Sequence, residues 1–292
     1  MRMLAPLLLV ALPGCGTAPP ATASDATPAI WRVADADTEI WLFGTIHALP
    51  PGIAWSGGPV GKAIARADTL VLEVGDITDA RTQAARFLKV ADAPGLPPLA
   101  ERIPAADRAA LDVAVAKSGL PAARLDAMKS WAAAIALGAS QWREQGAERS
   151  HGIDSVLAAT FRAAGKPIVG LETAEQQFGF FDALPEDAQR RLLVDTVRDG
   201  SDAASIFSGM VDAWKRGDPQ AINATFDEQL RGNPALKAIL LDARNARWAQ
   251  WIAGRMRQPG RVLVAVGAGH LAGEGSVQQR LTTQGIVAKR LR

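Results

Sequence analysis

Two hydrophobic periods alternate along this chain and predict strands separated by helices. Short runs of branched and aromatic residues predict strands over 30–33, 39–43, 69–74 and 167–171, and in RVLVAVGAGH from Arg261. The first two flank an Asp-rich turn and predict a hairpin. The runs at 69–74 and from Arg261 are typical of buried strands, and 167–171 follows a predicted helix, as strands of parallel sheets do. Apolar positions at helical spacing fill 79–145 and 174–257, and a final helix and edge strand are expected within 275–292.

This order of elements predicts one α/β domain over 29–292. Its sheet is expected to be mixed but largely parallel, with an inserted helical lobe at about 79–145. No Gly/Ser-rich linker interrupts the region, which favours a single domain. The two halves repeat a strand followed by Gly-x-x-His and a strand ending in Glu, so a pseudo-duplicated core is a further hypothesis.

The N-terminal residues predict export and a lipid anchor. Residues 1–14 combine Arg2, a short apolar run and small residues, in the proportions of a signal peptide. Cys15 follows directly and resembles the lipidated cysteine of bacterial lipoproteins, with 15–28 as a tether. Gly16 then favours the outer membrane, facing the periplasm, by resemblance to lipoprotein sorting signals. A plain secretion signal with an incidental cysteine is the alternative.

Composition narrows the function classes. The 292 residues are 48% hydrophobic, enough for a sizeable core, and carry a net charge of +2 with both signs well mixed. Without a polybasic segment, a nucleic-acid partner is not expected. Cys15 is the only cysteine, so the fold has neither an intrachain disulfide nor a cysteine nucleophile.

Four polar residues fall where predicted strands end. In open α/β sheets these ends open into the ligand crevice. Two imidazoles and two carboxylates suit a divalent metal such as zinc, manganese or cobalt. Gly44 and Gly267 stand three residues before the histidines, where a glycine permits a sharp turn and a close approach to a ligand. The four residues are His47, Glu73, Glu172 and His270.

A purely structural interpretation stays open for each of these side chains. The histidines could be hydrogen-bonded in turns, and the glutamates could cap helices. His151 and Asp154 lie at a predicted helix start, where they either cap the helix or contact the site from its second shell. Arg244 and Asn245 lie in an amphipathic helix and are candidates for stabilising negative charge. The chain has neither an H-E-x-x-H motif nor G-x-S-x-G.

Five blocks in this order resemble the TraB/GumN family, which includes the Tiki proteins. They are WLFGTIHALP, LVLEVGD, HGIDSVLAATFRAAGKPIVGLETAEQQ, LLDARNARWAQWI and VLVAVGAGHLAGEGSVQQRL. The resemblance implies an α/β core related to erythromycin-esterase and haem-binding ChaN-like proteins. Tiki members are described as metal-dependent proteases, so it also implies that Gly44, His47, Glu73, Gly267 and His270 are active-site positions.

Residues and resemblance together predict a lipid-anchored envelope metallohydrolase, acting on a peptide or protein. His47, His270, Glu73 and Glu172 are the expected metal ligands, with Glu172 also the expected general base. Arg244 and Asn245 are expected to stabilise the oxyanion. The alternative is a non-catalytic module that binds haem, a metal or a peptide in the same crevice.

Overall fold

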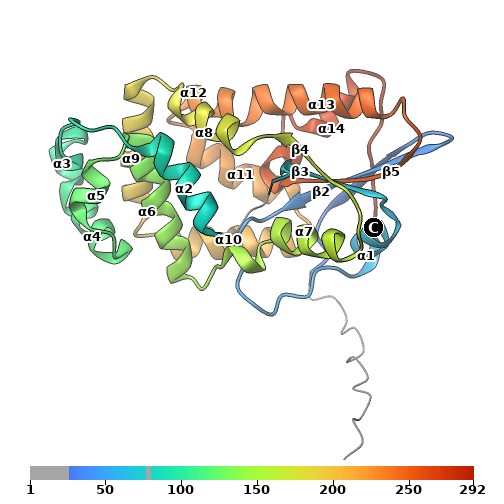
Figure 1. Cartoon of the computed structure of the whole chain (residues 1–292), viewed down its shortest axis with the longest axis horizontal. Helices are drawn as coiled ribbons and strands as arrows, with labels where there is room; N and C mark the ends of the chain where they lie inside the picture. The colour runs from blue at the N-terminus through green and yellow to red at the C-terminus, as the bar shows by residue number, and fades with distance from the viewer. Residues whose placement is uncertain (1–25, 77–79) are drawn as a thin grey trace, which may run out of the picture.

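The computed structural model describes residues 26–76 and 80–292. The predicted signal peptide, the lipidation site Cys15 and most of the tether lie outside these ranges. Within these ranges the chain forms fourteen α-helices and one sheet, which occupies the right half of Figure 1. The strands are β1 (Ile30–Ala34), β2 (Thr38–Thr45), β3 (Thr69–Val74), β4 (Ile168–Glu172), β5 (Gly260–Gly267) and β6 (Lys289–Arg290).

The helices cover both faces of the sheet and extend beyond one end of it. Short helical turns connect several of them: η2 (Arg149–His151), a π-helical turn η3 (Ala238–Asp242) and η4 (Ala268–Leu271). The α-helices are α1 (Gly58–Arg66), α2 (Ala80–Ala91), α3 (Leu99–Arg102), α4 (Arg108–Ser118), α5 (Ala122–Asp126), α6 (Ser130–Glu144), α7 (Ile153–Ala163), α8 (Ala174–Asp182), α9 (Glu186–Asp199), α10 (Ala203–Lys215), α11 (Pro219–Leu230), α12 (Pro234–Lys237), α13 (Ala243–Arg255) and α14 (Val277–Thr282).

The strands form one sheet in the order β4-β3-β5-β2-β1-β6. The four strands β4, β3, β5 and β2 are parallel, while β1 pairs antiparallel with both β2 and β6. The predicted α/β class with a mixed, largely parallel sheet is therefore confirmed. The two strands that carry Gly-x-x-His, β2 and β5, are neighbours, and Thr45 stands opposite Gly267.

Alternation along the central strands sends side chains to two separate cores. In β5, Leu263 and Ala265 join a core shared with α1, α7 and α10. Val262 and Val264 join a second core beneath α13 and α14. A strand buried on both faces needs apolar residues at every position, which explains the uninterrupted hydrophobic run in the sequence.

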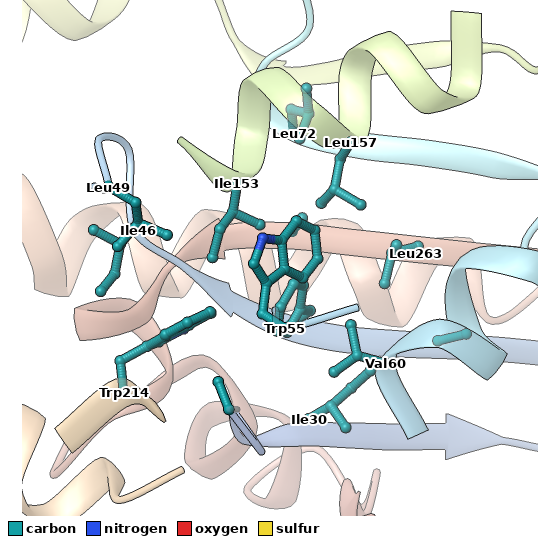
Figure 2. Packing of buried hydrophobic residues seen from close by; sticks show 14 of the residues in the cluster. Ile30, Ile46, Leu49, Trp55, Val60, Leu72, Ile153, Leu157, Trp214 and Leu263 are labelled. Carbon is teal, nitrogen blue, oxygen red and sulfur yellow. The ribbon is translucent and has the colours of Figure 1, made fainter. Parts of the chain in front are cut away.

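Large side chains fill the first core. Figure 2 shows Ile153 and Leu157 of α7 pointing toward the sheet, with Trp55 between them and the strands. Trp55 stacks on Phe43 with ring centroids 5.8 Å apart. The buried Trp214 of α10 donates its indole N–H to the carbonyl oxygen of Gly44 at 2.8 Å. This bond ties a helix to the end of β2, where the polar residues begin.

The helical lobe forms a core of its own, at the left of Figure 1. Its buried residues come from α2 to α6, as the apolar periodicity of 79–145 suggested, and also from Leu193, Val194 and Val197 of α9. Trp131 is fully buried there and stacks near Phe178 and Phe181. Among the described residues, no helix is long and apolar enough to cross a membrane.

Candidate functional site

Strand parity places Glu73 under helix α13. In β3, Leu70 and Leu72 face the core with α7, so Val71 faces the core with α13. Side chains alternate along a strand, and Glu73 therefore faces the same side as Val71. There its carboxylate meets Arg244 of α13, whose Nη2 donates to Oε2 at 2.6 Å. Both side chains are 8% exposed, so this ion pair is largely removed from water.

Glu73 accepts hydrogen bonds from several elements. The backbone N–H of Gly267, at the end of β5, donates to Oε1 at 2.6 Å, and Gln177 of α8 donates to Oε2 at 3.0 Å. Burial opposes ionisation of Glu73, but the positive charge of Arg244 and His47 and the Gly267 N–H outweigh it. These groups hold the pKa of Glu73 well below its usual range.

Arg244 bridges the ends of β3 and β4. Its Nε lies 3.0 and 3.1 Å from the two carboxylate oxygens of Glu172, while its Nη2 contacts Glu73. The π-helical turn Ala238–Asp242 directly precedes it, and Nη1 donates back to the Leu240 carbonyl at 3.2 Å. Its guanidinium also lies over the Trp248 ring at 4.6 Å. A planar, permanently charged group suits a bridge between two carboxylates.

Glu172 contacts cationic and amide donors. Besides Arg244, the Nη2 of Arg247 lies 3.2 Å from Oε1, and Gln177 donates to Oε2 at 3.3 Å. The Glu172 side chain is 3% exposed. The sequence predicts this residue as a metal ligand and general base, but its hydrogen bonds favour a role in holding Arg244.

His270 is buried and has a defined tautomer. Asn245 donates its Nδ2 to the Gly275 carbonyl, which turns Oδ1 toward His270 Nδ1 at 2.6 Å. Nδ1 therefore carries the proton, and Nε2 accepts from Arg244 Nη1 at 3.1 Å. Burial, with the positive charge of Arg244 nearby, lowers the pKa of His270 to about 3, so the ring is neutral.

His47 has a different environment. Its Nδ1 lies 2.8 Å from Oδ2 of Asp154, whose other oxygen accepts from the Thr45 hydroxyl. The negative charge of Asp154 raises the pKa of His47 to about 9, although burial acts in the opposite direction. The His47 side chain is nonetheless 48% exposed. The imidazole is therefore protonated at neutral pH and accessible to solvent.

A close backbone contact brings Asp154 to His47. A Cβ on Gly152 would lie 2.0 Å from the His47 carbonyl oxygen, so only glycine permits this approach. The Ile153 N–H then bonds to the Ile46 carbonyl, and helix α7 begins beside the end of β2. Asp154 uses its carboxylate on His47 and Thr45 and makes no cap to its own helix.

The two motif glycines have different uses, and neither has a positive φ. The expected sharp turn at the strand end therefore does not account for them. A Cβ on Gly44 would lie 3.1 Å from Cα of Ala268, so this glycine allows η4 to pack on β2. A Cβ on Gly267 would lie 3.1 Å from Glu73 Oε1, 3.5 Å from His47 Nε2 and 3.6 Å from His270 Cδ2.

Three of the four expected metal ligands thus meet at the Gly267 notch, the space that a Cβ on Gly267 would occupy. His47 and His270 each direct Nδ1 to an outer acceptor, which is the usual support of metal-binding imidazoles. The donor types fit a zinc- or manganese-type ion. Arg244 Nη1, however, contacts His270 Nε2, and no group of three His, Cys, Asp or Glu in the described chain is already spaced to hold a metal.

Some residues of this site had not been predicted, and one prediction lies apart from it. His151, in η2, has its Nδ1 3.6 Å from Glu148, and the structure does not bring it to Glu73. Gln177 and Arg247 join the carboxylates but were hidden within ordinary helical sequence. Gln177 lies one helical turn beyond Thr173, and Arg247 lies one turn beyond Arg244. These spacings were the only sequence signal for either residue.

Comparisons with known proteins identify relatives of this chain. The chain is 30% identical over 254 residues to the uncharacterized protein YbaP of Escherichia coli strain K12, covering 87% of this chain and 92% of that protein. It is also 30% identical to the uncharacterized protein YbaP of Shigella flexneri, over 82% of this chain and 86% of the relative. No solved structure matches the chain. The model of the TraB/PrgY/gumN family matches residues 29–290, so the chain belongs to the TraB/PrgY/gumN family.

Proposed function

We propose that this protein is a metal-dependent hydrolase, acting on a peptide or protein, with its metal site at the Gly267 notch. The convergence of His47 Nε2, Glu73 Oε1 and the His270 ring on this one space carries the proposal. A glycine at 267 leaves the space open, whereas any side chain would fill it. A single buried ion pair would need no such notch.

The chain's own residues have separate tasks in this proposal. His47, Glu73 and His270 would hold the ion, for which His47 must release the proton on Nε2 to solvent. Asp154 and Asn245 orient the two rings. A bound divalent ion would lower the pKa of a coordinated water and polarise a substrate carbonyl. Arg244 must give up its bond to His270 Nε2 when that nitrogen binds the ion.

Arg244 has a second task once Nη1 is released. Its guanidinium stays attached to Glu172 through Nε, so the charge remains fixed beside the notch. There it stabilises negative charge that develops on the substrate's carbonyl oxygen. Glu172 acts mainly as the residue that positions Arg244, in preference to the general-base role that the sequence suggests.

Metal binding tests the proposal directly. The full chain is stripped with a chelator and titrated calorimetrically with Mn²⁺, Co²⁺ and Zn²⁺. We expect one site in the wild type and loss of that site in His47→Ala and His270→Ala. His151→Ala is the matched control, because this third histidine contacts Glu148 instead. Equal binding by the wild type and both site variants would contradict the proposal.

The contact between Arg244 Nη1 and His270 Nε2 favours one alternative, a binding module without catalysis. In that case the crevice around the notch binds a metal, haem or a peptide but does not activate water. The metal-loaded protein is therefore incubated with a denatured protein substrate and a mixed peptide library. Cleavage that disappears in Glu73→Gln supports the hydrolase, whereas metal or haem retention with no cleavage supports the binding module.

The lipid anchor is a separate proposal that depends on Cys15 alone. We expect radiolabelled palmitate to enter the wild-type chain during expression in a bacterial host and to be absent from Cys15→Ser. Fractionation of the envelope then tests the outer-membrane assignment. Incorporation of label into Cys15→Ser would rule out the anchor at this position.

A further inference from the structure

The two edges of the sheet differ in how well they are protected. The β6 edge has only two residues, Lys289 and Arg290, both exposed and charged. Short, charged edges are a common defence against unwanted strand pairing. The β4 edge is longer and apolar, with no charge before Glu172, and Val169 is 42% exposed. An apolar edge strand without this protection calls for a functional explanation.

The backbone of β4 presents hydrogen-bonding groups away from the sheet. Leu70 of β3 is paired with Ile168 and donates its N–H to the Pro167 carbonyl at 3.0 Å. In a parallel ladder such bonds alternate along the strand. The N–H and C=O groups of Ile168 and Gly170 therefore point away from β3, and within the described ranges they bond to no other residue. Gly75, just after β3, packs closely over one face of the Gly170 backbone.

A cleft of about 510 Å³ lies along this edge. Ile168, Gly170 and Leu171 line it, and its far wall includes Arg86 of α2 and the first turn of α8. Glu172 belongs both to this cleft and to the Arg244 network. The cleft therefore borders the Arg244 network at Glu172, although His47, Glu73, Gly267 and His270 do not line it.

The charges of the cleft favour one kind of ligand. Three carboxylates line it against one guanidinium. Glu172 is neutralised by Arg244 and Arg247, and Asp76 bonds to Arg86 at 2.6 Å. Glu175 is 64% exposed and lies 3.9 Å from the same guanidinium, which leaves the rim with an excess of negative charge. A neutral or basic ligand is therefore favoured over an acidic one.

From the open edge, the cleft and its charge we infer that β4 binds an extended, neutral-to-basic peptide segment as an added strand. Main-chain hydrogen bonds to Ile168 and Gly170 would provide affinity, as in other cases of strand addition. The segment would be directed toward Glu172 and so toward the Gly267 notch. As a substrate groove this inference rests on the proposed hydrolase, but the binding itself does not require cleavage.

The test measures the binding of labelled peptides to the metal-stripped full chain by fluorescence anisotropy. The probe is a labelled peptide of alternating valine and threonine with a terminal lysine. Its first twin is N-methylated at every second amide, and its second twin has aspartate for lysine. We expect both twins to bind more weakly than the parent, the N-methylated peptide by about tenfold or more, because several main-chain bonds are lost.

Protein variants locate the binding at one edge. Ile168→Pro removes an outward N–H at the start of the edge strand, where proline is tolerated, and circular dichroism checks its folding. Val169→Lys adds a charge to the same edge without disturbing a buried position. Val287→Lys is the matched control, because Val287 is 62% exposed beside the opposite edge. We expect the first two variants to bind the peptide about tenfold more weakly, and the control to bind it as the wild type does.

The outcomes separate this inference from the proposed function. Binding that depends on β4 but leads to no cleavage after metal loading supports the inference and contradicts the hydrolase. Cleavage that is insensitive to Val169→Lys supports the hydrolase and overturns the inference. Equal binding of the N-methylated twin, or no binding of the parent peptide, also overturns it.

Discussion

The two Gly-x-x-His motifs end on neighbouring parallel strands, yet their histidines have opposite environments. His270 is buried, neutral and fixed by Asn245 and Arg244, whereas His47 is half exposed and protonated beside Asp154. The same four-residue pattern therefore has two uses. The surroundings of each ring, not the motif, decide the protonation state, because burial and Arg244 lower the pKa of His270 while Asp154 raises that of His47.

The largest difference in stability is expected between variants of the two arginines that contact Glu172, Arg244 and Arg247. Arg244→Ala would leave Glu73 and Glu172 buried without their main partner, at a cost of about 3–5 kcal/mol in unfolding free energy. Arg247→Ala removes a side chain that is 48% exposed, so the loss should stay within about 1 kcal/mol. Urea denaturation of both variants measures the difference. Equal losses of unfolding free energy in Arg244→Ala and Arg247→Ala would show that the buried bonds of Arg244 do not stabilise the fold.

Removing each imidazole's Nδ1 partner should have unequal effects. Asn245→Ala leaves a buried Nδ1–H without an acceptor, with an expected loss of about 1–3 kcal/mol. Asp154→Ala acts on a half-exposed ring that water can reach, and should cost about 1 kcal/mol or less. Thermal and urea unfolding compare the two variants. A larger loss from Asp154→Ala would reverse the assignment of buried and accessible histidines.

The glycines offer a smaller and more selective test. Gly44→Ala places a Cβ against the backbone of Ala268, so we expect about 1 kcal/mol of destabilisation from overpacking. Gly267→Ala meets side-chain atoms of Glu73 and His47, which are able to shift. That variant should keep near wild-type stability but lose metal binding by calorimetry. Retained metal affinity in Gly267→Ala would remove the notch from the proposal.

Protonation gives the smallest but most direct contrast. NMR titration of the metal-free protein should show His47 with a pKa of about 9, shifted toward the ordinary 6.5 in Asp154→Asn. Because this folded-state pKa is raised, the stabilisation is complete below about pH 6.5 and is lost as pH rises through about 9. His270 behaves in the opposite way, since its lowered pKa weakens the fold as pH falls from 6.5 toward about 3. Asp154→Asn should therefore flatten only the alkaline limb of stability against pH.

Much of the fold could be predicted from the local pattern of hydrophobic residues. The uninterrupted apolar run of β5 predicted a strand buried on both faces, and it lies at the centre of the sheet. The 167–171 run predicted a strand of a parallel sheet, and only the structure shows that β4 is its half-exposed edge. Hydrophobicity reports that a segment can be buried, but strand order depends on long-range pairing, which no local window contains.

The candidate site divides in the same way. Sequence placed His47, Glu73 and His270 at strand ends, and in parallel strands these ends share one edge, so their convergence followed from topology. The partners came from elsewhere in the chain. Gln177 and Arg247 lie in unremarkable helical sequence, and only the docking of α8 and α13 brings them to the carboxylates.

By itself, the sequence determined the type of each element, the α/β class and which side chains are able to bind a ligand or take part in a reaction. These properties depend on composition and short-range periodicity. Only the tertiary structure decided that Arg244 donates to Nε2 of His270, that Asp154 keeps His47 protonated, and that β4 lies at the edge of the sheet. Charge states and free edges depend on which surfaces meet in space. The contacts of Asp154 with His47 and of Arg244 with Glu73 join residues more than a hundred positions apart, beyond the reach of any local pattern.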